Sequence, residues 1–391
     1  MYKIPADKDN RITILALNWR DIRSKKAGGA EIHTHAILKG ADPKKYRIFH
    51  IAMEDEGAET EFELDGVTYL RKGGALGVIT YARKFYHANE DQIDFVIDQC
   101  NTHRFFTGLW VPAEKRIFYI HQLTREIWDI HMGFPFNKIG KAMETPFLRL
   151  QKKDTTITIS QSTKDDLVAV GFDEKKVHVV PEYFTTEPWT PEQFDEKRQP
   201  TQFVYVGRYA KYKGIDVSIE ALAKIKEKFP ETRLVVVGKK DEDYVKKSLK
   251  PLCDKCSLTL SDTDRNADVY LTGFVTDEEK LHFQSESHCL LFPSIREGWG
   301  LIITEAAIVG TPSIVYDAPG SRDAVARGKA GYLTAENTVD GLAKVMLHTL
   351  EDKESYEKMR KAAYDFSTEY IKWGKRVDVI DDIITKMQRG R

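Results

Sequence analysis

Short apolar runs recur along the chain between longer mixed stretches, and this pattern predicts strands that alternate with helices. In the first half the runs are RITILALN, RIFHIAM, IDFVIDQC, RIFYIHQ and TTITIS, at residues 11–18, 47–53, 93–100, 116–122 and 155–160. Strands separated by helical stretches indicate a parallel sheet that is covered by helices on both faces.

A second set of strands begins after residue 200. These strands are expected at 202–206, 233–238, 269–275 and 289–293. A chain of 391 residues is long enough for two domains, each with its own core. We therefore predict an α/β protein built from two Rossmann-like, doubly wound domains.

The boundary between the two domains is predicted at EYFTTEPWTPEQFDEKRQP, because its prolines and charged residues are typical of a linker. We place an N-terminal domain at 1–182, the linker at 183–200 and a C-terminal domain at 201–372. The chain is predicted to be helical from Lys353 onward, so these helices include the end of the C-terminal domain and residues 373–391.

Charge and cysteine content exclude several classes of protein. Lys and Arg number 59 and Asp and Glu number 60, so the net charge of −1 gives no field that favours nucleic acid. The first residues lack the apolar core of a secretory signal and no apolar run reaches the length of a membrane span, so we expect a cytoplasmic protein. Cys253 and Cys256 have no further Cys or His beside them, so no zinc site is predicted.

The glycine-rich loop 293–300 lies between a buried strand and an apolar helix. Gly298 and Gly300 permit a tight turn there, which directs the amides of Trp299, Gly300 and Leu301 toward one point. Free amides at the start of a helix attract anions, so the loop is suited to a phosphate or a sugar hydroxyl.

Two glutamates lie eight positions apart in this stretch, Glu297 in the loop and Glu305 in the helix between apolar neighbours. An ionised carboxylate on an apolar helix needs a partner. A ribose diol is one candidate for Glu305, and a nearby lysine or backbone amide is another.

Two cations follow the strand 202–206, in the segment VGRYAKYKG. Arg208 and Lys213 lie between Gly207 and a second glycine, at a strand-to-helix turn. A planar guanidinium and a compact ammonium together can neutralise the charge that develops on a departing diphosphate. Solvated surface cations would show the same pattern.

The first domain offers two further candidates. Gly28 and Gly29 lie just before a helix, where we expect them to leave backbone amides free for an anion. His121 lies at the end of the strand 116–122, at the edge of a parallel sheet where ligands bind, although a structural role is also compatible with this place.

Apolar and basic residues interleave between residues 133 and 153. A basic amphipathic helix of this kind can lie on a membrane surface, so peripheral membrane contact through 133–153 is one interpretation. We favour a second, in which the helix packs its apolar side on the sheet and exposes its basic side. The acidic runs at 241–243 and 262–264 are interpreted as helix caps and loop residues rather than metal ligands.

The E-x7-E pattern with EGWGL inside it resembles the donor-site signature of glycosyltransferase family 4. The members of that family are retaining enzymes of the GT-B fold, in which two Rossmann-like domains face a cleft. The resemblance extends over nearly the whole chain, and its motifs follow the order of the family: Gly28-Gly29, His121, Arg208 with Lys213, Gly273, and Glu297 to Glu305.

This resemblance implies a role for each motif. Glu297 and the amides after it would hold the donor sugar, and Glu305 would hold the nucleotide ribose. Arg208 and Lys213 would stabilise the leaving diphosphate, and His121 would face the reaction centre.

The resemblance also assigns backbone contacts. The backbone of Gly273, Phe274 and Val275 matches the family segment that meets the nucleotide base, and Gly28-Gly29 matches the segment that approaches the diphosphate and the acceptor.

Two positions depart from the family pattern. Trp299 stands where Phe is more common, and Pro181-Glu182-Tyr183 stands where Pro-Asn-Gly is usual. The last helix, within 373–391, is implied to return to the first domain.

The implied function is retaining transfer of a sugar from a nucleotide-diphosphate sugar to a hydroxyl acceptor, in glycan or polysaccharide biosynthesis. The acceptor can be a saccharide, a lipid-linked molecule or a small molecule. A UDP-sugar is favoured over a GDP-sugar, and no other cofactor is expected. No metal is expected either, because the two cations and the helix start already supply positive potential.

Two alternatives remain at this stage. A sugar-nucleotide 2-epimerase of the same fold would form its product without an acceptor. A non-catalytic sugar-nucleotide-binding protein would bind without turnover. A dehydrogenase is disfavoured because neither first strand is followed by G-x-G-x-x-G. The sugar, the acceptor and the oligomeric state stay open.

Overall fold

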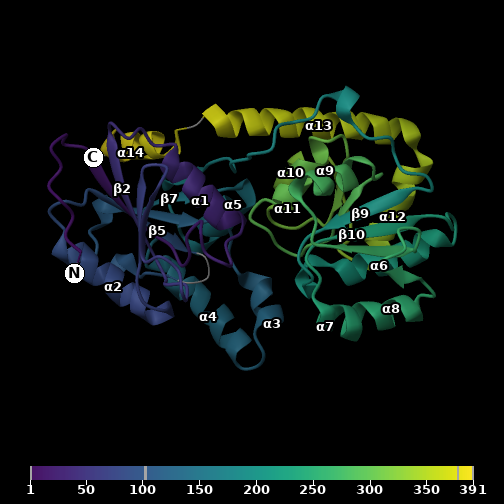
Figure 1. The fold of residues 1–391 in the computed structure, drawn as a ribbon, viewed down its shortest axis with the longest axis horizontal. Coiled ribbons are helices and arrows are strands. Elements are labelled where there is room, and N and C mark those ends of the chain that lie inside the picture. The colour runs from purple at the N-terminus through teal and green to yellow at the C-terminus, as the bar shows by residue number, and fades with distance from the viewer. Residues whose placement is uncertain (1, 101–103, 377, 390–391) are drawn as a thin grey trace. The chain divides into compact units, whose positions relative to one another are not determined.

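The computed structural model describes residues 2–100, 104–376 and 378–389. The predicted ranges 1–182 and 373–391 therefore include residues outside the described part. The chain forms two compact units, and each contains one sheet flanked by helices (Figure 1). Unit 1 comprises Met1–Arg125, Lys138–Tyr183 and Trp373–Arg391, and unit 2 comprises Glu126–Asn137 and Phe184–Lys372.

The sheet of unit 1 has the strand order β3-β4-β2-β1-β5-β6-β7-β8. Its paired strands are parallel except for the edge pair β3 and β4. The elements of unit 1 are β1 (Ile12–Leu17), α1 (Gly29–Lys39), β2 (Tyr46–Ala52), β3 (Glu61–Leu64), β4 (Val67–Arg71), α2 (Ala75–Ala88), β5 (Phe95–Cys100), β6 (Arg116–Ile120), α4 (Phe136–Arg149), β7 (Thr155–Thr158), α5 (Gln161–Val170), β8 (Val177–Val179) and α14 (Val379–Arg389). Helix α3 (Trp128–His131) follows β6 in the chain and belongs to unit 2.

The sheet of unit 2 has the order β11-β12-β10-β9-β13-β14-β15, and its paired strands are parallel. Helices α9 and α10 lie on one face of this sheet, and α6 and α8 lie on the other (Figure 1). The elements are β9 (Gln202–Val206), α6 (Ile215–Lys226), β10 (Arg233–Val237), α7 (Glu242–Tyr244), α8 (Lys250–Lys255), β11 (Leu260–Ser261), β12 (Val269–Gly273), α9 (Asp277–Ser285), β13 (Leu290–Phe292), α10 (Leu301–Ala307), β14 (Ser313–Val315), α11 (Ser321–Ala324), β15 (Tyr332–Leu333), α12 (Val339–Glu351) and α13 (Lys353–Arg376).

Both sheets reverse their direction of winding at one point, between β1 and β5 in unit 1 and between β9 and β13 in unit 2. In open parallel sheets the ligand binds beyond the carboxyl ends of the strands at such a switch point. The loop after β9 and the loop after β13 both carry predicted site residues. The predicted doubly wound α/β architecture is confirmed in each unit.

The antiparallel pair β3 and β4 was not predicted. It is a hairpin closed by Asp65 and Gly66, whose φ angles are 50° and 78°. Asp-Gly between alternating residues is the strongest local sequence signal for a hairpin turn, so the sequence did contain this information.

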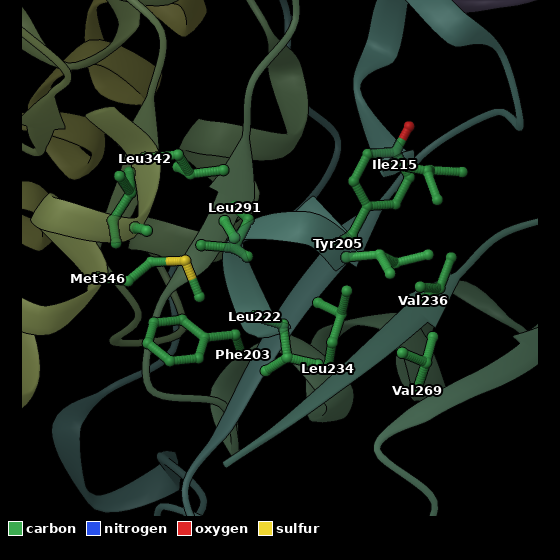
Figure 2. Packing of buried hydrophobic residues seen from close by; sticks show 14 of the residues in the cluster. Phe203, Tyr205, Ile215, Leu222, Leu234, Val236, Val269, Leu291, Leu342 and Met346 are labelled. Atoms are coloured by element: carbon green, nitrogen blue, oxygen red, sulfur yellow. The ribbon is translucent and has the colours of Figure 1, made fainter. Parts of the chain in front are cut away.

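The core of unit 2 explains why its strands read as continuous apolar runs. Phe203 and Tyr205 of β9 and Leu234 and Val236 of β10 are buried. They pack with Leu222 of α6 and with side chains of β13 and α12 (Figure 2). Strands covered on both faces need apolar residues at successive positions rather than at alternate ones.

Residues 184–200, most of the predicted linker, are fixed to unit 2 as an ordered strap. The Trp189 amide donates to Ile308 O at 3.1 Å, and the Asp195 amide donates to Ser285 Oγ at 2.8 Å. The Lys197 side chain is half-buried, and its ammonium donates to oxygens that include Thr311 Oγ1, at 2.7 Å. Burial lowers the pKa of Lys197 to about 7. The chain passes from unit 1 to unit 2 directly after Tyr183.

Helix α4 contradicts the interpretation that we favoured from the sequence. Every residue of α4 is described, and its buried side chains are Glu144 and Leu148. The Glu144 carboxylate accepts the amides of Thr124 and Arg125 at 2.6 and 3.0 Å. Phe147 is half-buried and meets Phe106 with ring centroids 5.6 Å apart, but Phe136, Ile139 and Met143 are exposed, so most of the apolar side of the helix is uncovered.

The end of the chain lies on unit 1. Tyr46 Oη donates to Asp381 Oδ1 of α14 at 2.8 Å, and Lys45 Nζ lies 3.1 Å from the same oxygen. Within the part of the chain that the structure describes, no helix is both long enough and apolar enough to cross a membrane.

Candidate functional site

The predicted cation Lys213 and the predicted carboxylate Glu297 meet in unit 2, although they are far apart in the sequence. Lys213 Nζ donates to Glu297 Oε1 at 2.5 Å, and Ser294 Oγ donates to the same oxygen at 2.6 Å. Their side chains are 16% and 13% exposed, so both groups are reachable from solvent. This pair lies at the switch point, because β9 leads to Lys213 and β13 leads to Glu297.

Arg208 follows β9 directly and is exposed. Its guanidinium donates to Tyr212 Oη at 2.9 Å, and its carbonyl accepts from Tyr205 Oη at 3.1 Å. The Gly207 amide donates to Val237 O at 3.0 Å, which joins the end of β9 to the end of β10. Arg208 is therefore held by the backbone while its charge stays available.

The loop after β13 turns where the sequence predicted. Gly300 precedes α10 with a φ of 96°, a left-handed conformation that favours glycine. Trp299 turns its indole inward, where the ring stacks on Tyr370 at 4.1 Å and Nε1 donates to Thr304 Oγ1 at 3.0 Å. Trp299 can therefore offer its backbone to a ligand, but not its ring.

Gly320 supports this loop from behind, and sequence reasoning missed it. A Cβ on Gly320 would lie 2.3 Å from the carbonyl oxygen of Glu297. The Glu297 amide donates to Pro319 O at 3.1 Å. Glycine is required because the two chain segments are in contact, and a contact between distant segments leaves no local sequence signal.

Glu305 has the lysine partner that was one of its two predicted alternatives. Lys280 Nζ of α9 lies 2.9 Å from Glu305 Oε2 and 3.0 Å from Asp277 Oδ1. Burial raises the pKa of the Glu305 carboxyl, and Lys280 opposes that shift without cancelling it. The ribose contact stays a prediction.

The predicted base-binding segment lies at the end of β12. Gly273 has a φ of 75°, and its carbonyl accepts the Gly238 amide at 3.2 Å. Phe274 is 82% exposed and Val275 is half-buried. An exposed backbone turn with an uncovered aromatic ring is compatible with a planar ligand.

In unit 1, His121 follows β6 at the carboxyl edge of the sheet, as predicted. Its Nε2 lies 3.2 Å from Gln99 Nε2, and its Nδ1 lies 3.6 Å from Glu182 Oε1. The side chain is 12% exposed. His121 therefore belongs to a polar cluster rather than to the apolar core.

Glu182 is the group in this cluster that sequence reasoning missed. Its Oε2 lies 2.8 Å from His33 Nδ1, which also lies 3.0 Å from the Tyr183 backbone nitrogen. Burial raises the pKa of the Glu182 carboxyl, but His33 and His121 outweigh burial and lower the pKa to about 2. The signal that could have found it is its place, three residues beyond β8 at the ligand edge of the sheet.

The prediction that Gly28 offers a free amide is wrong. The Gly28 amide donates to Glu31 Oε2 at 2.8 Å, within a capping box at the start of α1. Arg20 in turn donates to the same carboxylate, from Nε to Oε1 at 3.1 Å. The physical reason is local, since a glutamate at the third position of a helix competes for the first amides. Gly29 is the first residue of α1.

No group of carboxylates, histidines and cysteines among the described residues is arranged to hold a metal ion. Asp241 accepts the Tyr244 amide at 3.0 Å, so the predicted cap at 241–243 is confirmed. Asp262 pairs with Lys240 at 2.6 Å, and Asp264 accepts the Asn266 amide at 2.8 Å.

Two Rossmann-like units with these loops at their carboxyl edges define the GT-B class of proteins. Residues 27–187 match the family described as Glycosyltransferase Family 4, and residues 189–366 match the family described as Glycosyl transferases group 1. The chain belongs to the group 1 glycosyltransferases.

Similar proteins support this class. Glycogen synthase from Mycobacterium tuberculosis is 24% identical over 247 residues, which are 62% of this chain and 56% of that protein. The chain thus spans about half the length of the curated relatives that it matches. Sucrose-phosphate synthase from Thermosynechococcus elongatus superposes with a TM-score of 0.70 at 16% identity, covering 97% of this chain and 98% of that one. HepE from Anabaena, in complex with UDP and glucose, superposes with a TM-score of 0.69 at 17% identity, covering 96% and 100%.

Proposed function

We propose that the protein transfers a sugar from a nucleotide-diphosphate sugar to a hydroxyl acceptor in glycan or polysaccharide biosynthesis. The observation that carries this proposal is the contact between Lys213 and Glu297 at the switch point of unit 2. The donor nucleotide binds to unit 2, and the acceptor binds to unit 1.

In the proposed reaction the bond between the anomeric carbon and the diphosphate oxygen breaks while a bond to the acceptor oxygen forms. Arg208 and Lys213 stabilise the negative charge that develops on the diphosphate. The diphosphate oxygen takes the proton of the acceptor hydroxyl, so both events occur on one face of the sugar and its configuration is retained.

The remaining predicted residues bind and orient the donor. Glu297 accepts hydroxyl groups of the sugar, and the backbone amides of Gly298 to Leu301 lie beside it. Glu305 accepts the ribose hydroxyls, while Gly273 to Val275 meet the base. His121 contacts the sugar or the leaving group from unit 1.

UDP is the proposed nucleotide, a choice supported by the UDP and UDP-glucose complexes of HepE. Thermal unfolding with UDP-sugars and GDP-sugars tests it, because a ligand that binds the native state raises the melting temperature. We expect a UDP-sugar to stabilise the protein most. The same ligand should then be consumed with an acceptor present. Consumption without an acceptor would indicate an epimerase instead, and binding without turnover would indicate a binding protein.

Retention and independence of metal are proposed together with this reaction. Proton NMR of fresh product, formed in the presence of EDTA, tests both. We expect a retained anomer and undiminished activity, because Arg208 and Lys213 supply positive charge where other enzymes use a divalent ion. An inverted anomer would refute the stereochemical part, and loss of activity in EDTA would refute the electrostatic part.

A membrane surface is the further partner that we propose, and it is supported by the exposed side of α4. Large apolar side chains of unit 1 are exposed at four positions between residues 109 and 150: Leu109, Ile139, Met143 and Leu150. The exposed charged residues from 136 to 153 are all basic: Lys138, Lys141, Arg149, Lys152 and Lys153. Apolar residues among basic ones suit a bilayer that contains anionic lipids. Such a contact suits an acceptor that is carried by a lipid.

Sedimentation with phosphatidylcholine vesicles, with and without phosphatidylglycerol, tests the membrane contact. We expect binding to the anionic vesicles, weakened by salt, and loss of binding when Ile139 and Met143 are both replaced by Ser. Val168→Ser removes an exposed apolar residue from α5 and serves as the matched control. Equal binding by the double variant and the parent protein would refute the proposal.

A further inference from the structure

A carboxylate is buried where the chain leaves unit 1, at a position with no assigned role. Glu182 is 4% exposed and follows β8. A buried carboxylate is costly unless opposite charge and hydrogen bonds compensate it. The residues that surround Glu182 should therefore explain why it is there.

Two imidazole rings provide this compensation, and each presents Nδ1 to a different oxygen. His33 Nδ1 lies 2.8 Å from Oε2, and His121 Nδ1 lies 3.6 Å from Oε1. An unprotonated ring nitrogen would repel a carboxylate oxygen, so the carboxylate favours a proton on His121 Nδ1. His33 Nδ1 also accepts the Tyr183 amide at 3.0 Å, so the argument applies to His121 alone. A neutral Asn at position 182 could not exert this preference.

The opposite side of the His121 ring is fixed by a second chain of polar groups. Its Nε2 meets the Gln99 side-chain amide, and Gln99 meets the Thr34 hydroxyl at 2.6 Å. Thr34 also reaches the Ala30 carbonyl at 2.7 Å. The Gln99 amide can donate to Nε2, or accept from it if turned over. If the amide donates, a neutral ring carries its proton on Nδ1, toward Glu182, whereas if the amide accepts, Nδ1 carries a proton only when the ring is an imidazolium.

The backbone of Glu182 is held as closely as its side chain. A Cβ on Gly374 of α13 would lie 2.8 Å from the Glu182 carbonyl oxygen. The carboxylate therefore stays between the two histidines, because its backbone is packed against α13 and its side chain is buried.

We propose that Glu182 is the positioning residue for His121. Its carboxylate keeps a proton on His121 Nδ1 and, together with Gln99 on the Nε2 side, fixes the ring at the carboxyl edge of the sheet, where the sugar or the leaving group would meet it. This inference rests on the proposed role of His121 and assigns to Glu182 a role that acts through that histidine.

The first experiment compares Glu182→Gln, which removes the charge and keeps the shape, with Glu182→Asp, which keeps the charge. We expect Glu182→Gln to lower kcat by about 10- to 100-fold, the range typical when the hydrogen-bond partner behind a metal-binding histidine is removed. The donor KM should stay unchanged, and Glu182→Asp should recover part of the rate. Asp154→Asn removes a carboxylate paired with Arg116 at the opposite edge of the same sheet, and it serves as the matched control with unchanged kcat.

The second experiment is a double-mutant cycle with His121→Ala. If Glu182 acts through His121, adding Glu182→Gln to His121→Ala should lower kcat no further. Independent, multiplying losses would overturn the inference. Full activity of His121→Ala alone would instead remove the proposed role of His121, so the two failures are distinguishable.

Nitrogen-15 NMR of the parent protein keeps the inference testable even if Glu182→Gln does not fold. We expect the His121 signals of a ring protonated at Nδ1. A neutral ring protonated at Nε2 alone would overturn the inference, whatever the variants do.

Discussion

Glu182 of unit 1 is buried and Glu305 of unit 2 is half-buried, and the pKa values of the two carboxyls move in opposite directions. In unit 1, burial raises the pKa of Glu182, but His33 and His121 outweigh burial and lower it to about 2. In unit 2, burial raises the pKa of Glu305, and Lys280 does not cancel that effect. Both carboxylates have basic side chains as neighbours, so the presence of a basic neighbour does not by itself decide the direction of the pKa shift.

The difference lies in how the partners are shared. Glu182 has an imidazole at each oxygen. Glu305 has one lysine, which also pairs with Asp277. A carboxylate with a basic side chain at each oxygen stays ionised. A carboxylate whose one basic neighbour also pairs with another acid is stabilised further when a ligand donates hydrogen bonds to it. We infer that Glu182 orients other groups and that Glu305 is suited to receive a ligand.

The largest effect is expected from a cation that should serve turnover rather than stability. Lys213→Ala or Arg208→Ala should lower kcat by about 100- to 1,000-fold, because such a contact typically contributes about 3 kcal/mol to the barrier. The melting temperature should change little, since both side chains reach solvent. Steady-state kinetics beside circular dichroism measures both quantities. A variant that is folded and nearly fully active would remove its cation from the proposed site.

The next largest effect is expected at Glu182, in the dependence of unfolding free energy on pH. The fall in the Glu182 pKa from 4.5 to about 2 corresponds to about 3 kcal/mol of unfolding free energy. Because the folded-state pKa is lowered, this contribution is present above pH 4.5 and is lost as pH falls toward 2. Urea unfolding should therefore show a large gap between the parent protein and Glu182→Gln at pH 6 that closes toward pH 3. A gap that does not change with pH would contradict this assignment.

Glu305→Gln should give a smaller effect with the opposite dependence on pH. The folded-state pKa of Glu305 is raised, so the carboxylate costs stability as pH rises above 4.5. Without ligand, the stability of Glu305→Gln relative to the parent protein should therefore increase from pH 4.5 upward. With a nucleotide sugar the variant should bind less tightly. Denaturant unfolding measures the stability without ligand, and calorimetry measures the affinity for the nucleotide sugar. Unchanged affinity would refute the ribose contact.

The smallest effect is expected at Trp299. Trp299→Phe keeps a ring against Tyr370 but removes the bond from Nε1 to Thr304, so unfolding free energy should fall by about 1 kcal/mol. Turnover should be unchanged, because the indole faces inward. A large loss of turnover would show that the side chain reaches the ligand.

Much of the fold was predictable because its information is local. The apolar runs at 12–17, 202–206 and 233–237 are long enough to identify buried strands from periodicity. Strands β11 and β15 are two residues long, so no periodicity can form in them. The exposure of α4 was missed because an amphipathic pattern does not say which environment covers the apolar side.

Site residues that belong to a local sequence motif could be predicted, but site residues that are defined by a contact between distant segments could not. The positions of Lys213 and Glu297 followed from loops after strands, and their contact is consistent with the switch-point rule. The partner of Glu305 lies 25 positions earlier on another helix, and Gly320 is fixed by a distant carbonyl. Neither contact has a local signature. The prediction that the Gly28 amide is free was wrong because Glu31, three residues away, accepts that amide.

The three-part composition of unit 1 has a consequence for synthesis on the ribosome. Unit 2 has all of its residues once Lys372 has been translated, but unit 1 also requires Trp373–Arg391. The surface of the N-terminal sheet that α14 covers therefore stays exposed until residues 373–391 have emerged from the ribosome. Loss of α14 should then leave unit 1 prone to aggregation while unit 2 still folds.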